Sequence, residues 1–457
     1  MKRETKVKIA NNTVFGSNQT AKTNPSFKHR IILDIGASNP KGSLKITAQT
    51  DDGKDIYTRS GEFVNDTPDG FESSEDFATK VMQVVKSTHN YVKDLCANGT
   101  FKPGEEKLSG IGIFVPGTVL GDKIAFIPNL KDKNGESLKN VDFSEIKKDI
   151  ITKKTEETGI EANPDNFRFV VTKDLGGAGL GIAKILAKRN QLNEGDYIMG
   201  IMTGGGFGSV DIKVKHDNVE IETSESSSYL THDFNNHTMQ KLGRMGVSVK
   251  SHITRFMDTI GMEEMIPTVL KAGDARLVTS NEIHIKNSNT ELISELLQDP
   301  RFRIKTTNKD NTIIELDESN PKFAEKMRKS RYEAVNNYAD SVSLIAVNKI
   351  NDCLNKIILV GPFAHGVNKH VKEHQEIYGA KDLPDLIEQK VQKRIEDVDL
   401  PSSQGLKDLY NFEVICDESI NFPNNTFAGD ALLNKDLTFT NNRGSWMEIP
   451  RATLASL

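Results

Sequence analysis

Short apolar runs and longer amphipathic segments alternate along the first part of the chain. An apolar run from Arg30, small residues at 36–38 and a second run with period-two alternation predict a β-hairpin. Apolar residues at helical spacing over 73–99 predict a helix that begins after two serines. The stretch 108–130 predicts a buried strand, a Pro116-Gly117 turn, a second strand and a loop at 128–130, and 141–158 predicts a charged helix. This alternation is typical of α/β proteins.

Two apolar runs in the middle of the chain each pass into small residues. The first begins at Phe167, ends at Asp174 and continues as a glycine-rich, helix-like segment. The second ends in Thr203 and a run of three glycines, Gly204, Gly205 and Gly206, before alternation resumes towards 214. Together they suit phosphoryl transfer, because a carboxylate can accept the proton of an attacking hydroxyl while glycine N–H groups hold phosphate oxygens. Taken singly, the acid is more often a helix N-cap and the glycines a hairpin turn.

The second half predicts longer helices. A polar block over 222–240 is interpreted as a surface or active-site loop, and helices are predicted over 249–262 and from 279. The stretch 299–317 reads as irregular, with TIIEL as a short strand. A long helix is predicted from Pro321, followed by a buried strand, a Gly-Pro turn and another helix. The charged stretch 369–399 is interpreted as helical with a solvated face, and FEVIC from Phe412 predicts a strand.

Length, charge and cysteine content narrow the class of protein. The 457 residues allow two or three domains, and the net charge of -5 offers no basic face, which disfavours a nucleic-acid partner. No apolar run approaches the length of a membrane span, and residues 1–28 read as a flexible tail without the apolar core of a signal peptide. Three widely spaced cysteines, Cys96, Cys353 and Cys416, favour reduced thiols and a cytoplasmic location.

The motifs, taken in order, resemble those of the ROK and glucokinase-like sugar kinases of the actin/hexokinase/Hsp70 superfamily. DIGASN with Lys41 resembles the first phosphate motif, and GIGIFVPGTVLGDKIAFIPNL resembles the stretch that leads to a sugar-contacting asparagine, here Asn129. VVTKDLGGAGLG is similar to the catalytic segment, with the base at Asp174. IMGIMTGGGFGSV is similar to the second phosphate motif and KIILVGPFAHGV to the adenosine motif. The resemblance covers Arg30 to about Asp436.

The resemblance implies an α/β fold of two RNase-H-like, actin/hexokinase-type domains, with mixed sheets flanking an interdomain cleft. The smaller domain would span 29–172 and carry the sugar side and the first phosphate motif. The larger would span 173–457 and bind ATP, with the last segment free to return to the smaller domain. Closure on the substrate would exclude water from the acceptor site.

The same resemblance implies a set of site residues. Asp174 would be the general base, and Asp34 would hold Mg²⁺ directly or through its waters. The cofactor-binding positions would be Asp34, Gly36, Ser38, Lys41, Thr203, Gly204, Gly205, Gly206 and Gly361. The sugar-contacting positions would be Asn129, Lys173, Tyr229 and His232.

Several positions depart from the family pattern. Lys173 stands where an asparagine is usual, and Tyr229 where a glutamate is expected. Lys173 either faces solvent or binds an acidic or phosphorylated substrate. Pro362 replaces a common glycine, and no thiolate cluster follows His232, so no zinc is expected. No helix-turn-helix pattern precedes Arg30, which disfavours a ROK-type repressor.

Two functions follow from these observations. The first is ATP-dependent phosphorylation of a sugar hydroxyl. The second is non-catalytic binding of a nucleotide or sugar by a protein that keeps the kinase fold but whose sugar pocket has diverged from the kinase pattern. Asp34, Asp174 and the glycine turn favour the enzyme, whereas Lys173 and Tyr229 favour the binding protein or a different substrate. The expected partner is a small sugar, with no nucleic acid and no membrane; a homodimer, the sugar and the hydroxyl stay open.

Overall fold

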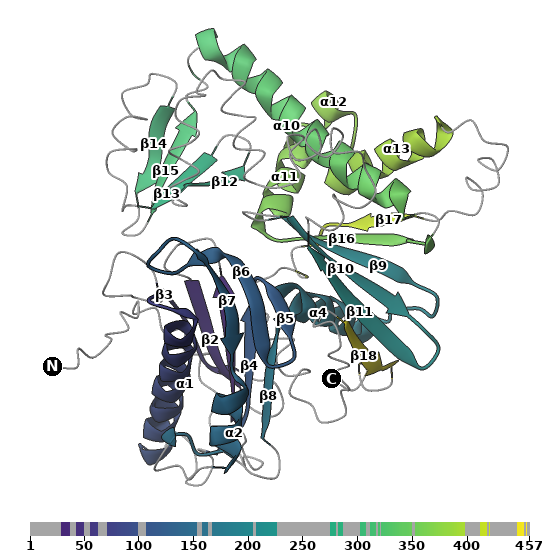
Figure 1. The fold of residues 1–457 in the computed structure, drawn as a ribbon. Helices are drawn as coiled ribbons and strands as arrows, with labels where there is room; N and C mark the ends of the chain where they lie inside the picture. Colours follow the sequence, from purple (N-terminus) through teal and green to yellow (C-terminus); the bar gives the residue numbers. More distant parts are fainter. Residues whose placement is uncertain are drawn as a thin grey trace. The chain divides into compact units, whose positions relative to one another are not determined.

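The structure is a computed structural model of the 457-residue chain (Figure 1). It describes residues 29–36, 43–49, 55–62, 71–98, 107–152, 158–162, 167–203, 207–225, 275–279, 282–286, 302–307, 311–316, 319, 321–349, 352–397, 412–417, 420, 446–451 and 454. The chain divides into two compact units. The first unit comprises Met1–Leu192, His216–Thr223 and Pro423–Leu457, and the second comprises Asn193–Lys215 and Ser224–Phe422.

The first unit contains a mixed sheet of five strands in the order β3-β2-β1-β4-β8. These strands are β1 (His29–Gly36), β2 (Ser43–Gln49), β3 (Asp55–Glu62), β4 (Leu108–Val115) and β8 (Arg168–Lys173). β1 and β2 form the predicted antiparallel hairpin, while β1, β4 and β8 run parallel to one another. Parallel and antiparallel pairs therefore occur in one sheet, which confirms the predicted α/β class with mixed sheets.

Helix α1 (Ser74–Ala97) packs on one face of this sheet. It begins where the sequence predicts, because the Ser73 side chain caps it by accepting a hydrogen bond from the Asp76 N–H. Its apolar side, with Phe77 and Val81, shares a core with Leu33 and Ile113, and all four side chains are fully buried. At about 25 cal/mol per Å² of apolar surface, burial of these side chains stabilises the packing of α1 on the sheet.

Helix α4 (Asp174–Lys188) follows β8 and is buried along most of its length. A Cβ atom built on its Gly177 would lie 2.4 Å from the ring of Phe114 in β4, so the absent side chain lets the helix approach the sheet closely. Leu33 and Ile113 belong to the core with α1. Because strand side chains alternate between faces, Phe114 and its register partner Asp34 lie on the other face, towards α4.

A smaller sheet in the first unit has the order β5-β6-β7. It comprises β5 (Thr118–Leu120), β6 (Lys123–Lys131) and β7 (Ser137–Asp142), and it is followed by α2 (Ser144–Thr152). The single strand predicted after Pro116-Gly117 is thus wrong, because a turn at Gly121 (φ 63°) divides it. The loop predicted at 128–130 is also wrong. Those residues lie in β6, where the pairing register shifts between Ile127 and Lys131.

The second unit contains four neighbouring strands in the order β17-β16-β9-β10. They are β9 (Tyr197–Thr203), β10 (Phe207–Val214), β16 (Lys356–Val360) and β17 (Glu413–Ile415). β9 pairs antiparallel with β10 and parallel with β16, and β16 pairs parallel with β17. The strands predicted on both sides of the glycine run and at FEVIC are confirmed.

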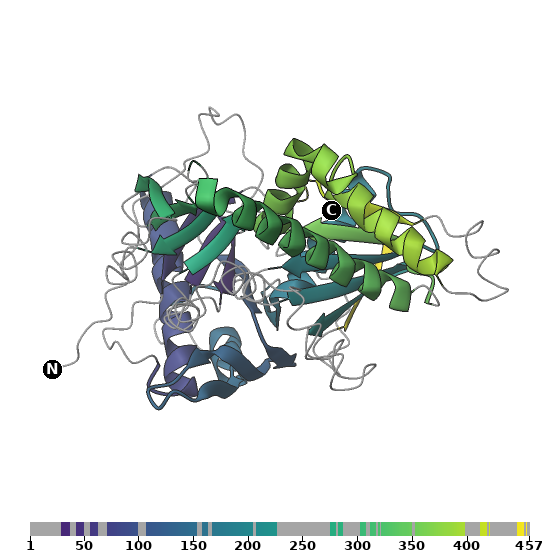
Figure 2. The same cartoon turned by 90° about the horizontal axis from the view of Figure 1, so that it is seen from above.

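Three longer helices accompany these strands: α10 (Pro321–Asn348), α11 (Pro362–Glu373) and α13 (Leu383–Glu396). Figure 2 shows α10 and α13 side by side, in agreement with their contacts. α10 begins at the predicted proline but ends before Ile350, and Cys353 just beyond it adopts a positive φ of 64°. None of the helices in the described ranges is both long and apolar enough to span a membrane.

The charged stretch 369–399 is helical in its described part, as predicted, but it is divided into several helices and does not only face solvent. It contains the end of α11, the short α12 (Gln375–Tyr378), a left-handed turn at Gly379 and then α13, capped by the Asp382 side chain. Helix α13 buries apolar residues at helical spacing, which the high charge of the segment obscured: Leu383, Leu386, Ile387, Val391 and Ile395.

A four-stranded antiparallel sheet in the second unit corrects two further predictions. It comprises β12 (Ala275–Thr279), β13 (Glu282–Lys286), β14 (Phe302–Thr307) and β15 (Asn311–Leu316). The helix predicted from 279 is wrong, and the stretch 299–317 contains a regular strand pair. The TIIEL strand is confirmed within β15. The helix predicted over 249–262 lies outside the described residues.

The end of the chain contributes one more strand to the first unit. β18 (Trp446–Pro450) pairs antiparallel with β11 (Asn218–Glu225), with Ile449 opposite Val219. Both side chains are buried, at 1% and 0% exposure. A segment from the C-terminus therefore packs with residues from the middle of the chain.

Candidate active site

One edge of the five-stranded sheet gathers the two carboxylates predicted from the motifs. Asp34 near the end of β1 is in register with Phe114 of β4, and Phe114 is in register with Thr172 of β8. Asp174 follows two residues later. The three strands are parallel, so their carboxyl ends meet at one edge, with β1 and β8 separated by two strand spacings of about 5 Å each. In α/β sheets, ligands bind beyond this edge.

Asp174 is the first residue of α4, and the cap position belongs to Lys173 with extended backbone angles (φ −66°, ψ 145°). The interpretation of Asp174 as the N-cap is therefore wrong by one residue. Its Oδ1 accepts a hydrogen bond of 2.7 Å from the Leu175 N–H, and the residue is half-buried. This hydrogen bond orients the Asp174 carboxyl group at the start of the helix, where the dipole is favourable to negative charge.

Lys173 is buried, with only 7% of its surface exposed. The interpretation that it simply faces solvent is therefore wrong. Lys173 is in register with Val115, which belongs to the core shared with α1. Strand alternation thus places Lys173 on the opposite face of the sheet from Asp34. The Lys173 residue, next in the chain to Asp174, is therefore buried at this sheet edge.

The Pro116-Gly117 turn follows β4 at the same edge. A Cβ atom built on Gly117 would lie 2.3 Å from the carbonyl oxygen of Phe126, so only glycine allows the turn to approach β6 this closely. β6 contains the predicted sugar-contacting Asn129, whose side chain lies outside the described part of the structure. The turn therefore fixes the strand that holds Asn129 relative to β4.

The strands of the second unit end in a different kind of edge. Val360 of β16 is in register with Met202 of β9, so Thr203, the last residue of β9, and Gly361, which follows β16, lie at the same edge. Gly361 has φ 99° and ψ 160°, which residues with a side chain rarely adopt, and it caps α11 without a side-chain hydrogen bond. Pro362 occupies the first turn of the helix, where a missing N–H costs little, so its departure from the family pattern is compatible with this structure.

Several predicted residues cannot be placed. Gly36 ends β1 opposite Ser43, but Ser38, Lys41, Gly204, Gly205, Gly206, Tyr229 and His232 all lie outside the described residues. Within the described ranges, no three His, Cys, Asp or Glu side chains cluster in a way that could hold a metal ion. The roles of the residues outside these ranges, and the expectation of no zinc, stay predictions.

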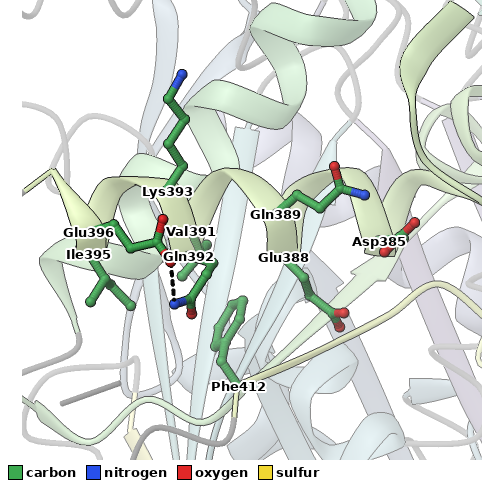
Figure 3. A pocket seen from close by; sticks show the side chains of 9 residues that line it. All are labelled: Asp385, Glu388, Gln389, Val391, Gln392, Lys393, Ile395, Glu396 and Phe412. Atoms are coloured by element: carbon green, nitrogen blue, oxygen red, sulfur yellow. Dashed lines mark hydrogen bonds between the residues drawn. The ribbon is translucent and has the colours of Figure 1, made fainter. Parts of the chain in front are cut away.

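The sequence did not indicate a groove beside α13 in the second unit. The groove has a volume of about 420 Å³, and Glu388 and Gln392 point to the same side of α13 as Phe412, while Lys393 points away (Figure 3). Glu388 accepts a 2.8 Å hydrogen bond from the Val414 N–H of β17, and burial raises the pKa of its carboxyl group. Among the described strands, β17 lies at the end of its sheet. Glu388 therefore binds a backbone N–H group, that of Val414, which could otherwise pair with a further strand.

A second feature that the sequence did not indicate is a contact between α11 and the residue after β17. The Sγ atom of Cys416 lies 3.6 Å from Nδ1 of His365. The two residues are far apart in the sequence: His365 lies within KIILVGPFAHGV, whereas Cys416 belongs to none of the motifs. Only the parallel pairing of β16 with β17 brings them together.

No family model and no curated protein matches the chain. Solved structures similar to it include sugar kinases and glucokinases. A glucokinase from Balamuthia mandrillaris in complex with glucose is 11% identical, with 89% of this chain and 93% of that chain covered and a TM-score of 0.49. A putative sugar kinase from Cytophaga hutchinsonii is 16% identical, with 88% and 99% covered and a TM-score of 0.45. A ROK family transcriptional regulator, a homologue of the E. coli MLC protein, is 12% identical, with 88% and 77% covered and a TM-score of 0.48.

Proposed function

We propose that the protein transfers a phosphoryl group from ATP to a hydroxyl group of a sugar, with Asp174 as the general base. The observation that carries this proposal is the placement of Asp34 and Asp174 at one edge of one sheet. Two carboxylates there would have separate roles in phosphoryl transfer. One would hold the metal ion and the other would act on the acceptor, because the reaction depends on positioning and charge more than on covalent chemistry.

Asp174 would accept the proton of the attacking hydroxyl as the new O–P bond forms and the bond from phosphorus to the leaving ADP breaks. The Leu175 N–H holds Oδ1, which orients the carboxylate before the substrate arrives. A positioned general base typically accelerates a reaction by about 10²–10⁴-fold. The cost of holding this charge is low because it lies at a helix N-terminus.

We expect Asp34 of the first unit to hold Mg²⁺ and the residues at the edge of the second unit to bind ATP. Magnesium in kinases is held by one or two carboxylates together with phosphate oxygens, which suits the half-buried Asp34. Thr203 and Gly204, Gly205 and Gly206 would hold the phosphates, and the backbone at Gly361 would let the nucleotide base approach closely, since no side chain intervenes. When bound, Mg²⁺ and ATP supply the phosphoryl group and offset its negative charge.

The buried Lys173 supports an acceptor that has an acidic or phosphorylated group. A buried ammonium group interacts with an anion more strongly than an exposed one, because water screens the charge less. Lys173 stands where the related kinases have an asparagine, so this acceptor would differ from a plain hexose at one substituent. Asn129, Tyr229 and His232 would contact its hydroxyl groups.

The test is an assay of neutral hexoses, amino sugars, sugar acids and sugar phosphates with Mg-ATP, comparing wild type with Asp174→Asn. We expect turnover on an anionic sugar and a loss of about 10²–10⁴-fold in kcat for the variant. Asp94→Asn on the exposed surface of α1 removes the same charge far along the sequence from the motifs and should keep full activity. Absence of turnover on every sugar, or equal turnover by Asp174→Asn, would contradict the proposal.

Asp34→Asn tests the second carboxylate separately. It should raise the Mg²⁺ concentration needed for half-maximal activity, while leaving binding of the acceptor unchanged in calorimetry without nucleotide. The non-catalytic alternative makes a different prediction: the protein would bind sugar or nucleotide without any turnover, and both variants would behave alike.

A further inference from the structure

We propose that Cys416 and His365 form a reactive thiol–imidazole pair that exchanges with small disulfides, and that modification of Cys416 weakens nucleotide binding. The first half concerns the second unit alone. The second half rests on the proposed function, because it assumes that Gly361 and its surroundings bind ATP.

The two side chains have the positions of a nucleophile and a base. Sγ of Cys416 lies 3.6 Å from Nδ1 of His365, within hydrogen-bonding distance for sulfur. His365 is 8% exposed on α11, so its ring is held by packing, whereas Cys416 is partly exposed and open to a reagent. A nucleophile within reach of an oriented base is the usual arrangement for activation of a thiol.

The reaction follows from this geometry. In the tautomer with its proton on Nε2, the His365 ring accepts the thiol proton at Nδ1. The Cys416 thiolate then attacks one sulfur of a small organic disulfide, an Sγ–S bond forms and the original S–S bond breaks. The leaving thiolate departs with the bonding electrons and takes the proton from the imidazolium. One disulfide is consumed and one is formed, so the disulfide reagent is the only oxidant required.

The pair lies close to the predicted nucleotide site. Cys416 directly follows Ile415, which is in register with Ile358, so it lies near the end of β16 that leads to Gly361. The backbone N–H of His365 donates to the carbonyl oxygen of Gly361 at 3.3 Å, one helical turn away. An adduct on Cys416 would therefore occupy space beside the first turn of α11 and the backbone that we expect to face the nucleotide.

The chain offers internal controls. Cys353 is exposed and Cys96 is buried. If exposure alone set reactivity, Cys353 would react fastest and Cys96 slowest. An unassisted thiol is only a few per cent ionised at neutral pH. If His365 accepts the thiol proton, the rate of thiol–disulfide exchange at Cys416 can therefore rise by about tenfold.

The first experiment measures mixed-disulfide formation at each cysteine of the intact protein with 2-hydroxyethyl disulfide at pH 7, using peptide mass spectrometry. We expect Cys416 to react about tenfold faster than Cys353, and His365→Gln to remove that difference. His370→Gln is the matched control, since His370 is also 8% exposed on α11 but bonds to Tyr378. Slower reaction at Cys416 than at Cys353 in the wild type overturns the proposal, whether or not the variants fold.

The second experiment separates the two halves. Mg-ATP should slow the reaction at Cys416 but not at Cys353, and the mixed disulfide should weaken ATP binding in calorimetry, with recovery on reduction. Cys416→Ser should bind ATP normally and be insensitive to the disulfide. If ATP binds but neither protects Cys416 nor is affected by the adduct, the link to the nucleotide is wrong. If ATP does not bind at all, the proposed function fails while the reactivity result stands.

Discussion

The edge formed by β1, β4 and β8 and the edge formed by β9 and β16 are built on the same strand arrangement but end in different chemistry. In each, the first strand forms an antiparallel hairpin with the next and pairs in parallel with a strand that comes later in the sequence. The first edge ends in carboxylates, at Asp34 and Asp174. The second ends in Thr203 and Gly361. The chemical character of each edge is therefore decided by the residues at the strand ends and not by the backbone arrangement.

The helices that follow these edges show the same contrast. α4 begins with Asp174, whose carboxylate accepts a hydrogen bond from the Leu175 N–H in the first turn of the helix. α11 begins after Gly361 and has no acidic residue in its first turn. An acidic side chain of the protein itself thus occupies the N-terminus of α4, whereas the N-terminus of α11 has none and is compatible with an anionic ligand. This difference agrees with the different roles that we propose for the two edges.

The largest effect on this comparison is expected from Gly361→Ala. At φ 99° a Cβ atom is strained by about 1–3 kcal/mol, and relief of the strain would move the backbone that we expect to face the nucleotide. ATP affinity should fall by roughly tenfold or more, while acceptor binding is unchanged. Gly379→Ala is the control, because Gly379 also has positive φ (63°) but ends α12 with open space around it. Equal losses of ATP affinity in both variants would remove the special role of Gly361.

A smaller effect is expected where α4 meets the first sheet. Gly177→Ala places a methyl group against the buried ring of Phe114, and such overpacking costs about 1–3 kcal/mol of unfolding free energy. Gly181→Ala on the same helix meets nothing within 4 Å and should stabilise slightly through helix propensity. Thermal or urea unfolding of the two variants measures the difference. Equal stability would show that the close approach of α4 to β4 is not required.

The smallest effect concerns the end strand β17. Burial raises the pKa of Glu388 above its usual 4.5, so the folded state holds the proton more tightly than the unfolded chain. The stabilisation from this proton is fully present below pH 4.5 and is lost as the pH rises through the folded pKa. Glu388→Gln keeps an oxygen for the Val414 N–H without this loss, so its stability relative to wild type should increase with pH in that window. A constant difference across pH would contradict the assignment.

Local patterns were enough to predict most of the elements at the first edge. The β1–β2 hairpin, the Ser73 start of α1, β4, β8 and the start of α4 follow from periodicity, capping residues and glycine placement. The second half was harder. In β12 to β15 the short alternating runs are rich in charged residues, and in α13 the buried positions are diluted among lysines and glutamates. High charge obscured the apolar period in both places, although α13 still buries five apolar residues.

The sequence by itself determined the type of most elements, the glycine requirements of the turns and the chemical character of Asp34 and Asp174, because these depend on neighbours in the chain. The tertiary structure decided which distant residues meet. Only parallel pairing of β1, β4 and β8 brings the two carboxylates to one edge, only the packing around β8 buries Lys173, and only the β16–β17 pairing brings Cys416 to His365. The physical reason is that strand neighbours are selected by the burial of complementary faces, and such burial has no signature within a local stretch of sequence.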